Sequence, residues 1–155
     1  MIGALLLAAA LVAPPSMPDP AKTPGVVRTD LTLQAICATK WGKDERHVTP
    51  AMKAEVFREY GFTGPHDPAF KPDAAGRRVE IDHLISRELG GADAVPNLWP
   101  EARATQPFNA DLKDRIENRL HVEVCAGRLS LEDAQQMMRT DWTAAYVKFF
   151  GPPPN

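Results

Sequence analysis

The sequence predicts a small α+β protein that folds as one domain. Its 155 residues allow one modest hydrophobic core, and 44% hydrophobic and 25% charged residues are typical of a globular domain. Residues 78–85 alternate between apolar and polar side chains, which indicates a strand. Apolar residues recur at every fourth position from Phe108 to Val124, which indicates a long helix with one buried side.

Residues 1–20 form an apolar N-terminal segment that predicts a signal peptide. The apolar run at 2–13 suits the hydrophobic region of such a signal and is too short to cross a bilayer as a helix. A basic start is missing, so a misplaced start codon or a disordered tail are the alternatives. We expect a secreted or periplasmic protein without stable membrane association after processing, or a cytoplasmic protein if the segment is no signal. Proline and small residues then predict an extended linker over residues 21–29.

Two short helices are expected before the strand. Thr32 is a suitable N-cap for the first, which ends at Trp41. Thr49 followed by Pro50 predicts the start of the second, which ends at Gly61. Four residues of the second helix are expected to face a core: Met52, Val56, Phe57 and Tyr60. The following segment, residues 62–76, is rich in Gly, Pro and Asp and predicts a loop.

The strand places Glu80 and Asp82 on one face and His83 on the other. A Gly-Gly loop follows, and residues 95–99 are expected to pair back as a second strand. The long helix then begins with Pro107 in its first turn and ends at Gly127. Its predicted buried stripe consists of Phe108, Leu112, Ile116, Leu120 and Val124.

Ser130 with Asp133 predicts the start of a last helix. Six of its residues are expected to be apolar contacts with the core: Leu131, Ala134, Met138, Trp142, Ala145 and Phe149. The folded domain is therefore expected to cover residues 30–150, with its central part at 77–125 and a proline-rich tail at 151–155.

Two cysteines, Cys37 and Cys125, lie far apart in the sequence. In an exported protein they predict one long-range disulfide, and in a cytoplasmic protein two free thiols. The absence of Cys-x-x-Cys and His-x-x-x-His spacings argues against a structural zinc site.

Residues 77–113 carry side chains suited to phosphodiester hydrolysis. If the helix packs against the paired strands, Asp82 and Asn109 offer oxygen ligands to one divalent cation, for which Mg²⁺ or Mn²⁺ is expected. The His83 imidazole can take a proton from water as a general base. Asn97 can hold the return loop, and Lys113 with the start of the helix favours a nearby phosphate.

The segment EIDHLISRELGG, followed by NLWPE and by Asn109 and Lys113, resembles the HNH endonucleases. The resemblance continues through residues 36–49, 113–135 and 141–146, as in a small bacterial and phage group without zinc-binding cysteines. It implies a ββα-metal core of hairpin and helix, flanked by further helices. It also implies His83 as the catalytic residue, Asp82 and Asn109 as metal ligands, and Asn97 as the middle asparagine of the motif.

Two further residues have open roles. Glu80 either supports the metal ligands or faces solvent, and Arg87 is a candidate phosphate contact beside Lys113. A formal charge of -2 gives no overall basic field, so any attraction of nucleic acid has to be local.

These observations predict a metal-dependent endonuclease that hydrolyses DNA, or RNA as well, with low sequence selectivity. One alternative is a catalytically inactive ββα scaffold that binds nucleic acid or protein. Another is an exported structural protein held by a Cys37–Cys125 disulfide. The sequence leaves the biological substrate and the oligomeric state open.

Overall fold

The structure, a computed structural model, describes residues 16–61, 79–103 and 106–154. The described helices and strands are α1 (Leu33–Ala38), α2 (Pro50–Glu59), β1 (Val79–His83), β2 (Leu98–Ala102), α3 (Ala110–Cys125) and α4 (Leu131–Phe150). Two 3-10 turns, η1 (Arg87–Leu89) and η2 (Val95–Asn97), lie between the strands. This combination of helices with an antiparallel pair of strands confirms the predicted α+β class.

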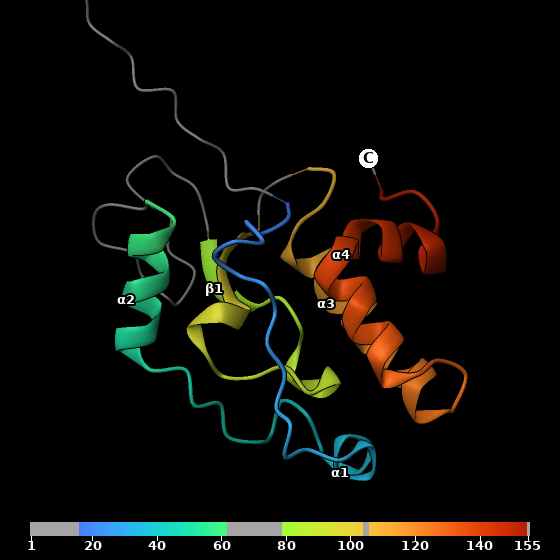
Figure 1. Ribbon diagram of the computed structural model, residues 1–155. Coiled ribbons are helices and arrows are strands. Elements are labelled where there is room, and N and C mark those ends of the chain that lie inside the picture. The colour runs from blue at the N-terminus through green and yellow to red at the C-terminus, as the bar shows by residue number, and fades with distance from the viewer. Residues whose placement is uncertain (1–15, 62–78, 104–105, 155) are drawn as a thin grey trace, which may run out of the picture.

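The β1–β2 hairpin lies between helices (Figure 1). Helix α2 lies on one side of it, α3 and α4 run side by side on the other, and α1 lies at one end. In the hairpin, Glu80 pairs with Glu101 and Asp82 with Trp99. The strand predicted at 95–99 is therefore misplaced, because the chain first forms η2. Pro96 has no backbone N–H for a strand ladder and its fixed φ suits a helical turn.

Two hydrophobic clusters fill the interior on the two sides of the hairpin. The larger joins α3 and α4 to the η1 region and contains Ile85, Leu89, Leu112, Ile116, Leu120, Val124, Ala134, Met138, Trp142, Ala145 and Tyr146. The smaller joins α2 to the hairpin and contains Val56, Phe57, Val79, Ile81, Leu98 and Ala102. The predicted stripe of α3 is buried from Leu112 onwards, as its four-residue spacing requires.

Helix α3 begins later than predicted. Asn109 has an extended backbone conformation, and its side-chain oxygen accepts a hydrogen bond from the Leu112 N–H at 3.2 Å. It is therefore the N-cap, so Pro107 and Phe108 precede the helix. Phe108 still packs on the larger cluster, with its ring edge-on to Trp142 at 5.6 Å between centroids.

The other helix starts follow the predicted caps at Thr32, Thr49 and Ser130. The last helix differs from the prediction because it is interrupted at Asp141, whose φ and ψ are -167° and 93°. There the Asp141 carboxylate accepts hydrogen bonds from the N–H groups of Thr143 and Ala144. This carboxylate caps the second part of α4, so a single helical pattern in the sequence folds as two helical segments.

The extended segment at 21–29 is part of the packed domain and not a free linker. Thr23 is buried and donates a hydrogen bond to the Leu98 carbonyl at 2.9 Å. Val27 forms a β-bridge with Gly91, and Arg28 donates its N–H to Gly90. The apolar run that predicts a signal peptide and the loop predicted at 62–76 lie outside the described residues.

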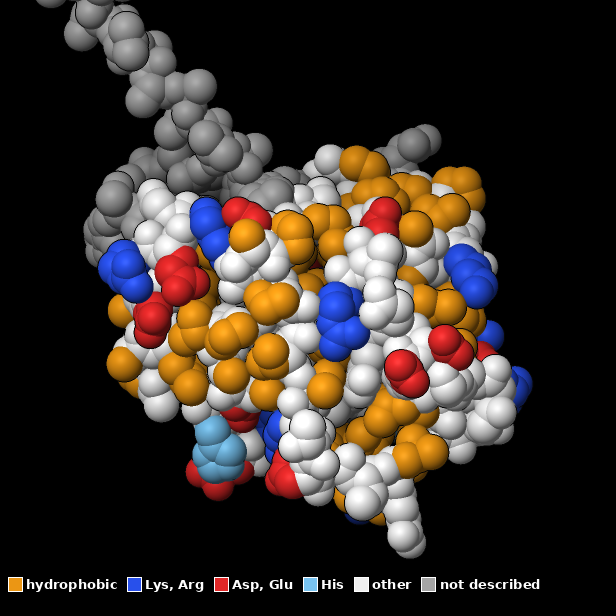
Figure 2. All heavy atoms as spheres, in the orientation of Figure 1, with side chains coloured by type: hydrophobic (Ala, Val, Ile, Leu, Met, Phe, Trp, Pro, Cys, Tyr) orange, Lys and Arg blue, Asp and Glu red, His pale blue; other side chains and the backbone are white. Residues whose placement is uncertain are grey.

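The predicted disulfide between Cys37 and Cys125 is present, with the two Cα atoms 5.6 Å apart. It connects α1 to the end of α3. Charged side chains of both signs are scattered among hydrophobic ones on the face that Figure 2 shows, in keeping with the near-neutral composition. Among the described residues, none of the helices has the length and apolar character needed to cross a membrane.

We predict that Gly91→Ala lowers the free energy of unfolding far more than Gly127→Ala. A Cβ at Gly91 would lie 1.7 Å from the Ile85 carbonyl oxygen, so the backbone of the hairpin loop has to move, at about 3 kcal/mol or more. Gly127 has open space around it, and its φ of 71° makes the alanine cost about 1 kcal/mol. Urea unfolding of both variants measures the difference, and equal losses would contradict this account of the loop.

Candidate active site

The end of β1 opens into a cleft of about 410 Å³ between the segment after α1 and the first half of α3. It brings together three residues singled out from the sequence, Asp82, His83 and Arg87. The full lining consists of Trp41, Gly42, Asp44, Arg46, Asp82, His83, Ser86, Arg87, Glu88, Asp114, Glu117 and Asn118. It therefore combines a histidine, two arginines and several carboxylates, a set that can carry out acid–base chemistry.

The Lys113 ammonium lies next to the cleft and is fully buried. Its Nζ is 2.7 Å from Asp82 Oδ2, 2.6 Å from Glu117 Oε1 and 3.3 Å from Glu101 Oε2. A buried ammonium is stable only with such partners, so it joins β1, β2 and α3. Because this side chain faces carboxylates and not solvent, its contact with a phosphate stays a prediction.

Carboxylates outnumber the ammonium group around Lys113. Burial alone would raise the pKa of Asp82, but Lys113 and His83 outweigh it and hold this pKa well below its usual range. Burial raises the pKa of Glu117 to about 8 and that of Glu101 well above its usual range, and it also raises the pKa of Asp114. The Lys113 ammonium thus favours the ionised form of Asp82, while burial and the negative charge of Asp82 disfavour ionisation of the other carboxyl groups.

Three of these carboxyl groups form a candidate cation site. Oxygens of Asp82, Asp114 and Glu117 all lie within 4.8 Å of one another and line the cleft. Carboxylate oxygens bind Mg²⁺ at about 2.1 Å, so ligands on opposite sides of the ion lie about 4 Å apart. The spacing and the hard oxygen donors therefore fit one divalent cation, which would also relieve the repulsion among the carboxylates.

His83 is buried in the wall of the cleft, and Asp93 holds its ring. His83 Nε2 is 2.7 Å from Asp93 Oδ1, and His83 Nδ1 is 3.7 Å from Asp82 Oδ1. Asp93 also accepts the His47 N–H at 2.7 Å and lies 3.7 Å from Arg87 Nε. Burial would raise the pKa of Asp93, but His83, the His47 N–H and Arg87 together hold it far below its usual range.

An ionised carboxylate only accepts hydrogen bonds, so the Asp93 contact assigns a proton to His83 Nε2. In the tautomer with its proton on Nε2 only, the ring has its lone pair on Nδ1, the nitrogen that lies 3.7 Å from Asp82 Oδ1. A water molecule in the cleft would meet the basic nitrogen of His83 beside the carboxylate cluster. This arrangement is that of a general base with an orienting carboxylate.

Asn97 is fully buried in the loop that leads back to β2. Its Oδ1 accepts the Ile85 N–H at 3.0 Å, and its Nδ2 donates to the carbonyls of Ile85 at 2.9 Å and Ala92 at 3.1 Å. The amide therefore closes the loop that begins directly after His83. This loop also carries Asp93, so Asn97 acts on the histidine through the backbone that it fixes.

The remaining predicted residues lie at the edges of this arrangement. The side-chain oxygen of Asn109 is engaged in capping α3, so its role as a metal ligand stays a prediction. Glu80 is buried and pairs with Arg103 at 2.9 Å, while burial and Asp82 raise its pKa to about 7. Arg87 lines the cleft and forms an ion pair with Asp44.

Three residues of this arrangement were missed from the sequence: Asp114 and Glu117, which line the cleft, and Asp93, which contacts His83. Glu117 carries a usable signal, because it is four positions after Lys113 on the same helical row. Asp93 stands in an irregular loop where no periodicity shows the direction of a side chain. Asp114 follows Lys113 directly in α3. That it lies close to Asp82 depends on how α3 packs against the hairpin, which the sequence does not show.

Comparison with models of known protein families gives no match, and no match is found among curated proteins or solved structures. The resemblance to HNH endonucleases therefore stays an expectation from the sequence.

We predict that the cation-free protein becomes less stable as the pH rises from about 5 to about 8. Burial raises the pKa of Glu117 to about 8 from an ordinary value of 4.5, so the folded state binds more protons than the unfolded state between these values. The free energy of unfolding therefore falls with rising pH. Burial also raises the pKa of Glu88 to about 7, so this group contributes in the same direction.

Urea unfolding in the presence of a chelator across this pH range measures the slope. Glu117→Gln should reduce the slope, and Glu55→Gln should leave it unchanged because the Glu55 side chain is 50% exposed on α2. A stability that rises with pH in the wild-type protein is incompatible with the raised pKa values of the buried glutamates.

Proposed function

We propose that this protein is a metal-dependent endonuclease of the HNH type, which hydrolyses phosphodiester bonds of DNA and possesses low sequence selectivity. The observation that carries the proposal is the position of His83. Its ring is oriented by Asp93 at 2.7 Å and lies beside a cluster of carboxylates that fits one divalent cation. Hydrolysis of a phosphodiester by a one-metal mechanism with a general base uses these two elements next to each other. The β1–β2 hairpin followed by α3 supports the same proposal.

In this mechanism His83 Nδ1 takes a proton from the attacking water. The imidazolium that forms is stabilised by the Asp93 carboxylate, which already bonds Nε2. Asp93 is in turn fixed by the His47 N–H and by Arg87. The histidine therefore needs little reorganisation when it gains the charge.

Asp82, Asp114 and Glu117 would hold the cation, which is Mg²⁺ or Mn²⁺ in this proposal. When bound, it supplies positive charge to stabilise the phosphate and the leaving oxygen. Five carboxyl groups and two arginines line the cleft, so the cation-free form offers a phosphate no net positive charge. Acidic residues of the cleft thus make nucleic-acid binding depend on the cation.

The Cys37–Cys125 disulfide supports a location outside the cytoplasm, since such bonds persist in oxidising compartments. We therefore propose a secreted or periplasmic nuclease. A catalytically inactive binding module is the second candidate. It is favoured by the Lys113 ammonium, which already neutralises part of the carboxylate cluster in the absence of any metal.

We predict that the purified protein nicks supercoiled plasmid DNA with Mg²⁺ or Mn²⁺ and stops when a chelator is added. His83→Ala should slow nicking by about 10²- to 10⁴-fold, the usual contribution of a general base. His47→Ala is the matched control, because the His47 side chain is 66% exposed and Asp93 contacts only its backbone N–H. Equal nicking by the wild type and His83→Ala would sink the proposal.

Thermal unfolding with and without Mg²⁺ separates the two candidates. A nuclease with a cation at Asp82, Asp114 and Glu117 should unfold at a higher temperature with Mg²⁺, and Asp114→Asn should reduce this shift. A binding module without a cation shows no such shift and no nicking, while it retains nucleic-acid or protein binding.

We also predict that Asp93→Asn lowers kcat about a hundredfold or more, with a smaller effect on KM. The amide can donate to His83 Nε2, which favours the tautomer with its proton on Nδ1 and removes the base. In a His83→Ala background the same substitution should have no further effect, because both residues act through one proton transfer. Additive losses in the double variant would show that Asp93 does not act through His83.

A further inference from the structure

We propose that the Cys37–Cys125 disulfide controls the cleft, so that reducing this bond opens the cleft wall without unfolding the rest of the domain. As a regulatory device, this inference rests on the proposed function of the cleft. It makes the enzyme active when the bond is formed and inactive when the cysteines are reduced.

The first observation is how little else holds α1. It has six residues, and only Ile36 among them is buried. Among the described residues, neither hydrophobic cluster includes a side chain of α1. Helices of this length do not persist in water without tertiary contacts, so α1 depends on the buried Ile36 side chain and on the disulfide to α3.

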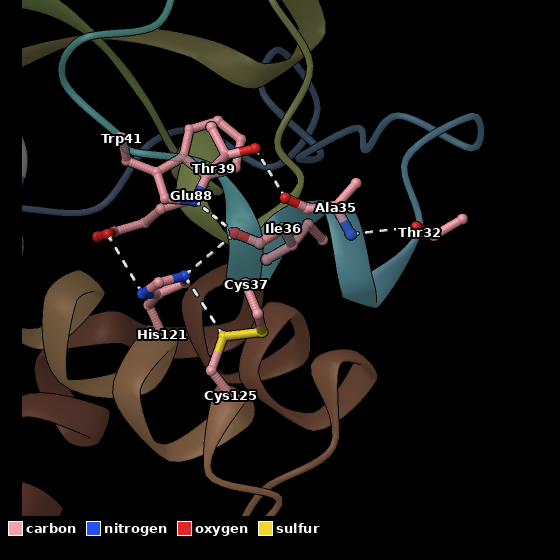
Figure 3. The surroundings of a disulfide bond; sticks show 9 residues. All are labelled: Thr32, Ala35, Ile36, Cys37, Thr39, Trp41, Glu88, His121 and Cys125. Carbon is pink, nitrogen blue, oxygen red and sulfur yellow. Dashed lines mark hydrogen bonds and ion pairs between the residues drawn. A yellow bond between two sulfur atoms is a disulfide. The ribbon is translucent and has the colours of Figure 1, made fainter.

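The second observation is that α1 leads directly into one wall of the cleft. Trp41, Asp44 and Arg46 follow it within a few residues and line the cleft. The Trp41 indole donates its Nε1–H to the Ile36 carbonyl at 2.8 Å, directly beside the disulfide (Figure 3). The position of the wall therefore depends on α1, together with the bonds that Arg46 donates to the Ile81 carbonyl at 2.8 Å and the His47 N–H donates to Asp93 at 2.7 Å.

His121 provides a second connection between the disulfide and the cleft (Figure 3). Its Nε2 lies 3.5 Å from Cys125 Sγ and 3.4 Å from the Ile36 carbonyl oxygen. Its Nδ1 lies 3.9 Å from Glu88 Oε2, and Glu88 lines the cleft. The disulfide is therefore connected to residues of the cleft through Trp41 after α1 and through His121 on α3.

Displacement of the segment after α1 would affect the position of the catalytic histidine through Arg87. Arg87 pairs with Asp44 and donates to the Glu45 carbonyl at 2.6 Å, both in the segment after α1. The same guanidinium lies 3.7 Å from Asp93, the partner of His83. Once the segment moves away, Arg87 loses these two partners and Asp93 loses a fixed neighbour.

The hairpin, α3 and α4 are held together by contacts that do not involve α1. The two hydrophobic clusters and the buried Lys113 ion pairs connect them without any contribution from α1. We therefore expect the effect of reduction to be local, and residues 33–47 to open while the domain stays folded.

The chemistry of the switch is thiol–disulfide exchange. Both cysteines are exposed, so a dithiol reductant reaches the bond. A thiolate of the reductant attacks one sulfur, and the reductant then closes to its own disulfide. Two electrons pass to the protein, the sulfur–sulfur bond breaks, and each cysteine sulfur takes up one proton. Exchange of the two thiols with a small-molecule disulfide, which accepts the two electrons and leaves as two thiols, reverses these steps outside the cytoplasm.

Hydrogen–deuterium exchange of the whole protein with and without dithiothreitol tests the inference. Reduction should raise amide exchange over residues 33–47 and leave exchange in α3 and α4 unchanged. Plasmid nicking with Mg²⁺ should fall about tenfold or more, since small displacements of positioning groups have effects of this size. Unchanged exchange over 33–47 after complete reduction overturns the inference, and so does increased exchange throughout α3 and α4.

The Cys37→Ser/Cys125→Ser double variant is the matched control. Without reductant it should exchange and nick like the reduced protein, and dithiothreitol should not change it further. It has no thiols, so capture of the assay metal by Cys37, His121 and Cys125 cannot explain its behaviour. If neither redox state nicks DNA, the proposed function fails, and the exchange over 33–47 still supports or overturns the control of the cleft by the disulfide.

Discussion

The buried ammonium of Lys113 is the interaction on which the arrangement of this domain depends. It contacts a carboxylate from β1, one from β2 and one from its own helix, at 2.6 to 3.3 Å. Removing one partner from such a group leaves an uncompensated buried charge, which typically costs about 3–5 kcal/mol. The hairpin and α3 are thus fixed in one relative position, and the hydrophobic clusters on both sides of the hairpin follow from it. The same group also concentrates carboxylates at the edge of the cleft, where a cation would be attracted.

The end of β1 explains how residues from opposite faces of a strand come to line one cleft. Successive side chains in a strand point in opposite directions, so Asp82 faces α3 and His83 does not. Asp82 and His83 are the last two residues of β1. Beyond them the strand does not continue, so side chains from its two faces can both border the cleft at this end. Asn97 then fixes the backbone of Ile85 immediately after the strand. Asp82 and His83 are therefore adjacent in the sequence but have different partners, Lys113 and Asp93.

Local signals in the sequence predicted much of this fold. The caps at Thr32, Thr49 and Ser130, the alternation of β1 and the stripe of α3 depend on neighbours within a few residues, and the structure confirms them. The disulfide confirms the pairing that the sequence predicts for an exported protein, where the alternative is two free thiols. The start of β2 and the interruption at Asp141 could not be predicted, since η2 and an aspartate cap compete with the regular pattern. Asp93 and Asp114 were missed because their partners, His83 and Asp82, are reached only through the tertiary fold.

Arg87 connects the two halves of the cleft. On one side it binds Asp44 and the Glu45 carbonyl, in the segment that follows the disulfide-bonded helix. On the other side it lies 3.7 Å from Asp93, which orients His83. A side chain already engaged by two carboxylates is not a free phosphate receptor in the resting cleft. Its partners suggest a different order of events, in which a cation first offsets the surplus negative charge of Asp114 and Glu117 and a phosphate then competes for the guanidinium. The placement of the base, the wall and the substrate would then depend on one arginine whose position is set by the segment that the disulfide anchors.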